Sequence, residues 1–133
     1  SAINLLEQAT VLFPQSAQMQ DKLSYAYARA GNYNQSLAHA REALKLDPKL
    51  VSAKINLGSA LLVKGNCEEA NKAYKEGTEL DPKNADAHYL LASTLERLGD
   101  TAGAKNELST FMGLVPTSDP RVSKVKEKLA TLK

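Results

Sequence analysis

Residues 31–48 read GNYNQSLAHAREALKLDP, and related stretches follow at 65–82 (GNCEEANKAYKEGTELDP) and 99–116 (GDTAGAKNELSTFMGLVP). Each stretch opens with glycine and closes with proline, and successive stretches begin 34 residues apart. Further columns keep this register outside the quoted stretches, so the sequence predicts a repeat with this period. The columns are the prolines at 14, 48, 82 and 116, the glycines at 31, 65 and 99, the leucines at 12, 46, 80 and 114 and at 23, 57 and 91, and the small residues Ala2, Ser36, Ala70 and Ala104.

Each period predicts two helices. Apolar residues recur at spacings of three and four over residues 17–30, which is typical of an amphipathic helix. Gly31 ends this helix because glycine accepts the left-handed conformation at a helix terminus. A second apolar stripe follows and ends before Pro48, since proline disfavours a helical conformation in the preceding residue. The short connections predict antiparallel helical hairpins.

The repeat resembles the tetratricopeptide repeat (TPR) family over essentially the whole chain. This resemblance implies an all-α fold, a right-handed α-α superhelix of antiparallel helical hairpins. Two features depart from the family pattern. Phe111 stands where a small residue is usual, so we expect the following helix to pack differently, and Gln20, Lys54 and His88 replace an aromatic residue of the first helix. The matching positions are Leu23-Ser24, Leu57-Gly58 and Leu91-Ala92, the bulky residues Tyr27, Leu61 and Leu95, the small residues Ser36, Ala43, Ala70 and Gly77, and the closing prolines.

The register divides the chain into five segments. Residues 1–13 align with the second helix of a preceding repeat. Three complete repeats follow at 17–50, 51–84 and 85–118, and residues 119–133 form a capping helix. Because the chain opens without methionine, it is interpreted as a fragment of a longer protein. Its compartment is left open between the cytoplasm and, if a leader was removed, the periplasm.

The two ends of the array are expected to differ. The last helix has one apolar and one basic face, so it caps the stack with a solvated surface. The first helix leaves apolar residues without a hairpin partner, so we expect this end to associate with another copy of the chain. The apolar residues of the cap are Val122, Val125, Leu129 and Leu132, its basic residues are Arg121, Lys124, Lys126, Lys128 and Lys133, and the apolar residues of the first helix are Leu5, Leu6 and Val11.

Composition and motifs indicate a protein that is not an enzyme. The 133 residues include 17 basic and 15 acidic side chains, a balance that does not favour nucleic acid as a partner. One cysteine and two histidines offer little for a metal site, and no phosphate-binding or catalytic motif is present. We therefore expect no cofactor. No apolar stretch is long enough for membrane insertion.

The resemblance places function on a surface. In TPR arrays the first helices of successive repeats line a concave groove that receives a peptide or helix of another protein. Several of the corresponding side chains are larger and more apolar than a solvated surface requires. Packing between helices is the alternative role for some of them. The predicted groove residues are Tyr25, Arg29, Ile55, Asn56, Ser59, Leu62, Tyr89, Leu90 and Arg97.

One TPR subclass grips the C-terminal carboxylate of heat-shock chaperones, and we do not expect that carboxylate clamp here. Of the clamp positions only Asn56 matches, and Asp21 and Asp86 stand where cations are needed. The leading hypothesis is therefore a non-catalytic scaffold or adaptor. The alternatives are an interaction or oligomerisation domain of a larger enzyme and a chaperone of secretion-type or pilus-type subunits.

Overall fold

The computed structural model of the chain describes residues 2–13 and 15–132, and within these ranges it contains eight α-helices and no strand. The predicted all-α fold is therefore confirmed. Pro14 and Lys133, which belong to the predicted proline column and basic face, lie outside the described residues. The helices are α1 (Ala2–Leu12), α2 (Ala17–Arg29), α3 (Tyr33–Leu46), α4 (Val51–Val63), α5 (Cys67–Leu80), α6 (Ala85–Arg97), α7 (Thr101–Leu114) and α8 (Arg121–Thr131).

The glycine column makes the sharp turns inside the hairpins. Gly31, Gly65 and Gly99 have φ values of 83°, 88° and 87°, in the left-handed region that glycine adopts without steric cost. In two of the three hairpins the side chain of the residue after the glycine, Asn32 or Asp100, then caps the next helix. The Asn32 side chain accepts a hydrogen bond from the backbone N–H of Gln35, which satisfies a donor at the start of α3.

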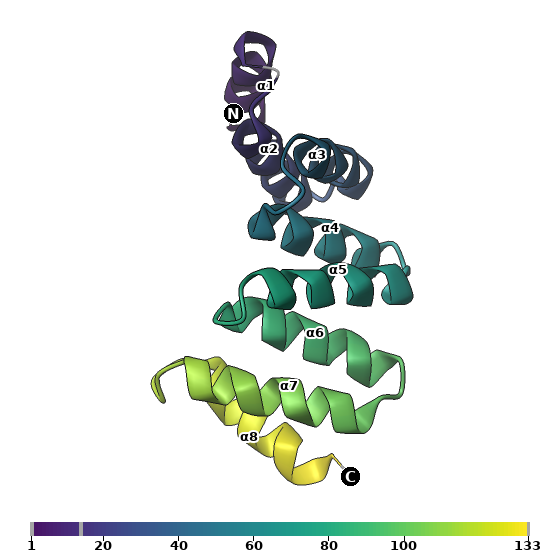
Figure 1. Cartoon of the computed structure of the whole chain (residues 1–133), viewed down its shortest axis with the longest axis vertical. Helices are drawn as coiled ribbons and strands as arrows, with labels where there is room; N and C mark the ends of the chain where they lie inside the picture. Colours follow the sequence, from purple (N-terminus) through teal and green to yellow (C-terminus); the bar gives the residue numbers. More distant parts are fainter. Residues whose placement is uncertain (1, 14, 133) are drawn as a thin grey trace.

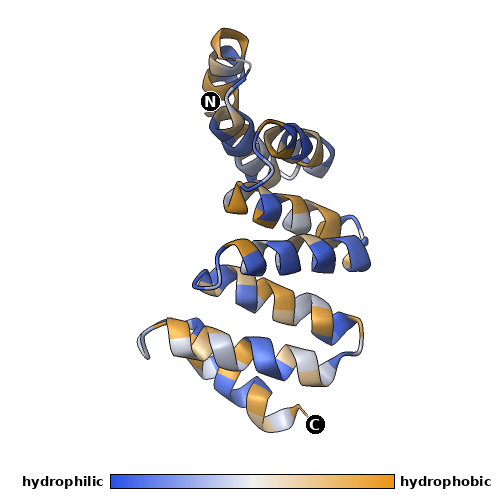
Figure 2. Cartoon of the chain, viewed as in Figure 1, coloured by the Kyte–Doolittle hydropathy of each residue, from blue (hydrophilic) through white to orange (hydrophobic). Residues whose placement is uncertain are grey.

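The helices stack in chain order along one long axis, with the two termini at opposite ends (Figure 1). Their direction turns along the stack, so that α1–α3 are viewed more nearly end-on than α4–α7 (Figure 1). Apolar and polar residues alternate along the helices (Figure 2), as expected when each helix packs on neighbours and still faces water. The core is consequently a ribbon along the stack, as in repeat proteins generally.

The middle of this ribbon surrounds Tyr74. The Tyr74 side chain is fully buried, and its hydroxyl lies 2.9 Å from the Ser59 hydroxyl. A Cβ atom at Gly58 would lie only 2.6 Å from the Tyr74 ring, so this close approach requires glycine. The residues of this central cluster come from α3 to α6: Leu37, Ala60, Leu61, Ala70, Tyr74 and Leu91.

Polar pairs occupy the column where the family aromatic is missing. In each hairpin, the residue of the first helix in this column contacts a polar side chain of the second helix. His88, for example, is buried and also donates through Nε2 to the Pro82 carbonyl oxygen. Each contact ties the two helices of one hairpin together. The pairs are Gln20 with His39, Lys54 with Glu76 and His88 with Glu107.

The last helix packs differently from the others, as the sequence around Phe111 suggested. The connection before α8 covers residues 115–120, whereas 47–50 and 81–84 make the earlier ones, and α8 lies obliquely to α7 (Figure 1). Phe111 is fully buried in a second cluster with Ala92, Leu108 and Val125. The large side chain is thus accommodated by this separate arrangement.

The basic face of α8 is less solvated than the sequence suggested. Arg121 is half-buried, and its guanidinium lies 4.8 Å from the centre of the Phe111 ring and 2.6 Å from the Asp86 carboxylate. Lys128 pairs with Glu96 at 2.8 Å. These two cations bind α8 to α6 instead of facing only water. The reason is that Asp86 and Glu96 flank the face of α6 that α8 covers.

Candidate functional site: a groove bordered by α1, α2 and α4

The main apolar groove lies at the N-terminal end of the array and has a volume of about 800 Å³. It runs along α2, because its lining positions on that helix recur with helical spacing from Asp21 to Ala30. Helix α1 borders one side and the first turns of α4 border the other. The lining residues are Ala2, Ile3 and Leu6 of α1, Asp21, Lys22, Tyr25, Ala26 and Arg29 of α2, Ala30 at its C-cap, and Ser52, Ile55 and Asn56 of α4.

Aliphatic side chains line the interior of this groove, and Tyr25 stands at its edge. Ile3, Leu6 and Ile55 are each partly exposed, so an occupant could remove more of their surface from water. Tyr25 is 53% exposed although it is a large aromatic residue. Large exposed aromatic side chains beside an apolar depression are typical of binding surfaces.

The Asp21 carboxylate in the groove is already engaged by hydrogen bonds. Ser52 donates to it through Oγ at 2.5 Å, and Asn56 donates through Nδ2 at 2.7 Å. Both donors lie on α4, so the network also joins α2 to α4. Asn56 belongs to the predicted groove set, and its side-chain amide nitrogen donates to Asp21. The network also satisfies part of the hydrogen-bonding capacity of the Asp21 carboxylate.

The rim carries two cations that make no ion pair among the described residues, Lys22 and Arg29. Both side chains are exposed. Arg29 donates to the Tyr25 hydroxyl at 3.2 Å, and its guanidinium lies 5.8 Å from the centre of the Tyr25 ring. This contact holds the tyrosine and the arginine together at the groove edge. The open groove therefore has a positive rim around an apolar interior.

The structure brings together only part of the predicted groove set. Four members lie in this groove. The other five lie farther along the array, where Ser59 bonds Tyr74, Leu62 and Leu90 are half-buried against the central cluster, Tyr89 is half-buried beside α8, and Arg97 is exposed. Packing between helices thus accounts for Leu62 and Leu90. The four groove members are Tyr25, Arg29, Ile55 and Asn56.

Burial and a nearby charge shift the pKa of Tyr74 in opposite directions. Burial raises the pKa of the Tyr74 hydroxyl, while the Ser59 hydrogen bond and the nearby Arg97 charge act to lower it. The net pKa is raised, so Tyr74 stays protonated and can donate at neutral pH. The group therefore serves packing between hairpins.

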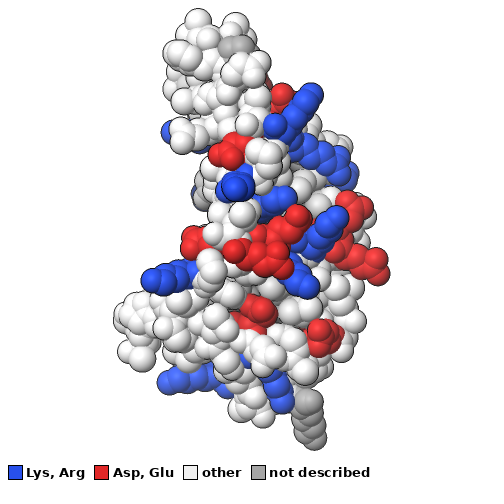
Figure 3. Space-filling view, viewed as in Figure 1, with Lys and Arg blue, Asp and Glu red and all other residues white. Residues whose placement is uncertain are grey.

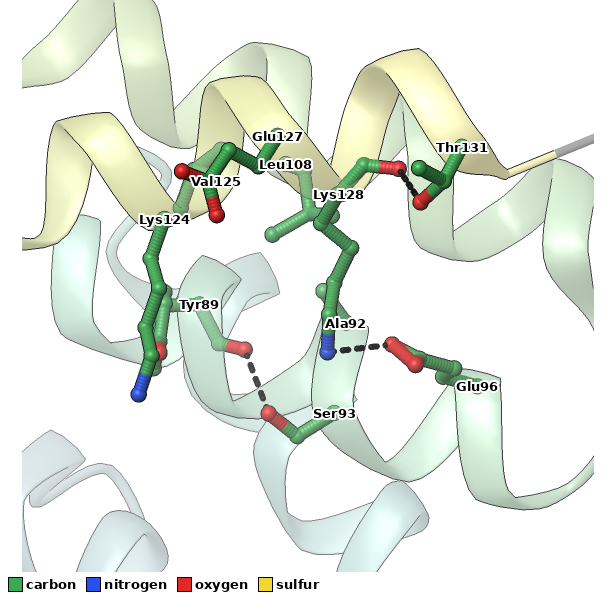
Figure 4. A pocket seen from close by; sticks show the side chains of 10 residues that line it. All are labelled: Tyr89, Ala92, Ser93, Glu96, Leu108, Lys124, Val125, Glu127, Lys128 and Thr131. Atoms are coloured by element: carbon green, nitrogen blue, oxygen red, sulfur yellow. Dashed lines mark hydrogen bonds and ion pairs between the residues drawn. The ribbon is translucent and has the colours of Figure 1, made fainter.

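The corresponding face of α6 is covered by α8. A smaller pocket of about 380 Å³ remains between them (Figure 4), bordered by Tyr89, Ser93 and Lys124. Lys128 reaches across to Glu96 in this view (Figure 4). Arg121 lies 5.5 Å from the centre of the Tyr89 ring. Among the predicted groove residues of α6, Tyr89 is consequently covered in part by the chain itself.

Acid is expected to loosen α8 through Asp119. Hydrogen bonds from Arg121 lower the pKa of Asp119 to about 2, below the value of about 3.9 typical of an unfolded chain. A depressed pKa contributes stability above the unfolded value, which is lost as the pH falls toward the folded value. We expect the stability difference between wild type and Asp119→Asn to shrink between about pH 4 and pH 2. Urea unfolding at a series of pH values measures this, and a difference independent of pH would contradict it.

Two kinds of feature are absent from the described residues, a metal-binding cluster and a membrane-spanning helix. Within residues 2–13 and 15–132, no group of three histidine, cysteine or acidic side chains is placed to hold a metal ion. In the same part of the chain, no helix has the length and apolar character required to cross a membrane. The groove can offer apolar contact, an aromatic edge and a positive rim.

The groove-lining residues of α1 were missed by the sequence argument. Ala2, Ile3 and Leu6 precede the first complete repeat, and the groove columns were taken only from the first helices of complete repeats. Their signal in the sequence was the apolar character of α1. That signal identified an exposed surface without indicating that one side of it borders the groove.

Comparisons with known proteins agree on the fold. Models of the TPR family match in three places: residues 18–50 and 86–118 match models described as "Tetratricopeptide repeat", and residues 58–99 match one described as "TPR repeat". A search of curated protein sequences gave no match. Several solved structures resemble the fold of this chain.

Three solved structures illustrate this likeness at low sequence identity. The type III secretion translocator chaperone SycD of Yersinia enterocolitica is 19% identical, with a TM-score of 0.78, covering 85% of this chain and 80% of SycD. MamA is 20% identical, with a TM-score of 0.84 and coverages of 96% and 72%. YrrB, described as a TPR protein with an unusual peptide-binding site, is 18% identical, with a TM-score of 0.84 and coverages of 93% and 62%. SycD has also been solved with a peptide of the translocator YopD.

Proposed function

Since the chain belongs to the tetratricopeptide repeat family, we propose that it is a non-catalytic scaffold that holds a segment of another protein in the groove bordered by α1, α2 and α4. The observation that carries this proposal is the groove itself, with Ile3, Leu6 and Ile55 inside and the exposed Tyr25 at its edge. Burial of such aliphatic and aromatic surface is the main source of affinity in peptide recognition. The peptide complex of SycD and the peptide-binding site of YrrB support this use of the fold.

The proposal includes two narrower alternatives. A chaperone of exported subunits would hold its client by the same contacts, and SycD, a translocator chaperone, is similar in fold. An interaction domain of a larger enzyme would use the groove to recruit or position a partner. Both alternatives require the groove to bind a protein segment, so the same experiment tests their common basis.

The test is a selection of displayed random peptides on the chain, followed by affinity measurements with the selected peptides. Tyr25→Ala combined with Ile55→Ala should weaken binding by about tenfold or more, since buried anchors contribute roughly 1–2 kcal/mol each. Arg97→Ala is the matched control, because this exposed residue lies outside the groove. Equal affinity of the double variant and the wild type, with unchanged helicity, would refute the proposal.

We also propose that the side of α1 away from the groove pairs with a second copy. Leu5, Val11, Leu12 and Phe13 are 69%, 79%, 73% and 61% exposed, and Glu7 is the only charged residue among the first 20 of the sequence. The end of the molecule formed by α1 is accordingly almost free of charge in Figure 3. An uncharged apolar face can pack on its own copy without repulsion.

Sedimentation of concentrated protein tests this pairing. We expect a dimer that Leu12→Glu dissociates, whereas Val63→Glu should leave it intact. Val63 is a suitable control because it is 57% exposed and lies on α4, away from α1. A monomer at every concentration would contradict the proposed pairing.

A further inference from the structure

The C-terminal end shows how this array receives an amphipathic helix. On α8, apolar residues follow one another at spacings of three and four, and this stripe packs against α6 and α7. Val122 and Val125 are buried by the contact, and Leu129 and Leu132 are partly buried. The side chains that receive the stripe include Ala92, Leu108 and Phe111.

The charges beside this stripe are complementary to those of α6. Arg121 lies 2.6 Å from Asp86, and Lys128 lies 2.8 Å from Glu96. The Lys128 pair bridges the two helices beside the small pocket (Figure 4). A basic amphipathic helix thus sits on a helix face with acidic flanks. Apolar contact provides the burial, and the flanking charges favour a helix of matching sign.

The N-terminal end offers a comparable surface without such a helix. Within the described residues α3, α5 and α7 each pack against the first helix of their own hairpin, and α1 packs against α2. The groove beside α1 follows α2 from Asp21 to Ala30, a rise of about 13 Å or two to three helical turns. A groove of this length, bordered by helices, is suited to another helix.

The charge at this end has the opposite sign. Lys22 and Arg29 stand on the rim without ion pairs among the described residues. Asp21, the one acidic residue that lines the groove, accepts hydrogen bonds from Ser52 and Asn56. The groove lining carries two positive charges, Lys22 and Arg29, and one negative charge, Asp21, so its net charge is +1, whereas the face of α6 offers acidic residues.

We infer that the groove accepts an amphipathic helix of another protein whose apolar stripe packs on Ile3, Leu6 and Ile55 and whose flanking acidic side chains pair with Lys22 and Arg29. This inference rests on the proposed function and specifies its partner. The bound helix covers apolar residues at the N-terminal end of the array, as α8 does at the C-terminal end. The α8 helix of a second copy is the wrong occupant, because its basic flanks would meet cations.

Three synthetic peptides of about 15 residues test the inference, all with the same leucine stripe. The first has glutamates on its flanks, the second has lysines there, and the third is the glutamate peptide with a central proline. Fluorescence anisotropy measures their affinities. The glutamate peptide should bind at least about tenfold more tightly than either of the others, since the lysine peptide meets repulsion and the proline breaks the helix.

Charge reversal supplies the matched variants. Lys22→Glu combined with Arg29→Glu should reverse the preference, so that the lysine peptide binds more tightly than the glutamate peptide. Arg41→Glu combined with Lys45→Glu changes the net charge equally at exposed sites of α3 outside the groove, and should leave the preference unchanged.

Each contrary result has a distinct meaning. Tighter binding of the lysine peptide to wild type would contradict the inference that the partner has acidic flanks. Equal binding of the glutamate peptide and the proline peptide would contradict the inference that the partner binds as a helix. If peptides from the random selection bind through Ile55 while all three synthetic peptides fail, the inference is overturned and the proposed function stands. If no peptide depends on Ile55, both are overturned.

Discussion

Replacing Tyr74 with alanine should lower the free energy of unfolding by about 3–5 kcal/mol, the range observed when a large buried aromatic side chain is truncated. The ring is fully buried among residues of α3, α4, α5 and α6. Its removal therefore leaves a cavity where three successive hairpins meet. Because each hairpin of a repeat array is stabilised by its neighbours, the substitution should lower the stability of the whole array. Urea unfolding followed by circular dichroism measures the change.

Two further substitutions separate packing from hydrogen bonding at this site. Tyr74→Phe loses only the hydroxyl contact with Ser59, so it should cost about 0.5–1.5 kcal/mol. Gly58→Ala places a methyl group against the ring and should cost about 1–3 kcal/mol, whereas Gly113→Ala meets no neighbour within 4 Å. Equal stability of the two alanine variants would contradict the packing described around Tyr74.

Replacing Phe111 with alanine should be similarly costly, by about 3–5 kcal/mol, but its effect should concentrate on α8. The Phe111 ring lies 5.2 Å from the Tyr89 ring and 4.8 Å from the Arg121 guanidinium, so it supports both the apolar and the charged contacts of that helix. Without it, α8 loses its main support on α7. Hydrogen exchange of residues 121–131 should then rise towards that of an unfolded segment.

The control for this prediction is Met112→Ala, which truncates a half-buried side chain at the edge of the same cluster. It should raise exchange in α8 much less. Exchange in α2 to α5 should change little in either variant, because none of those helices contributes a residue to the cluster around Phe111. Protection of α8 that survives the loss of Phe111 would contradict the account of this end.

The helices could be predicted from the sequence because their boundaries depend on local chemistry. A positive φ at Gly31 ends one helix, and Asp47-Pro48 ends the next. Because these signals recur every 34 residues, the sequence predicts the successive helical hairpins. The oblique packing of α8 was foreseen only as a departure at Phe111. Its direction depends on which side chains surround that ring, and this cannot be derived from spacing.

The groove could be predicted only in part, because side-chain direction within a column depends on neighbouring helices. Tyr25 and Ile55 line the groove bordered by α1, α2 and α4, and their role in binding a partner stays a prediction. Leu62 and Leu90 occupy equally plausible columns, yet they pack against the central cluster. Tyr89 lies on the side of α6 where the groove was predicted, but α8 packs against that side of the helix. These differences arise from contacts between residues far apart in the sequence.

The most direct test of the central claim is to locate a bound segment on the array. A photo-cross-linking amino acid placed at Tyr25 and, separately, at Arg97 would be irradiated with a selected peptide bound, and the products identified by mass spectrometry. Both positions are exposed, but only the first lies in the groove bordered by α1, α2 and α4. We predict cross-links from position 25 and none from position 97. Cross-links from position 97 alone would place the partner elsewhere and contradict the proposed function.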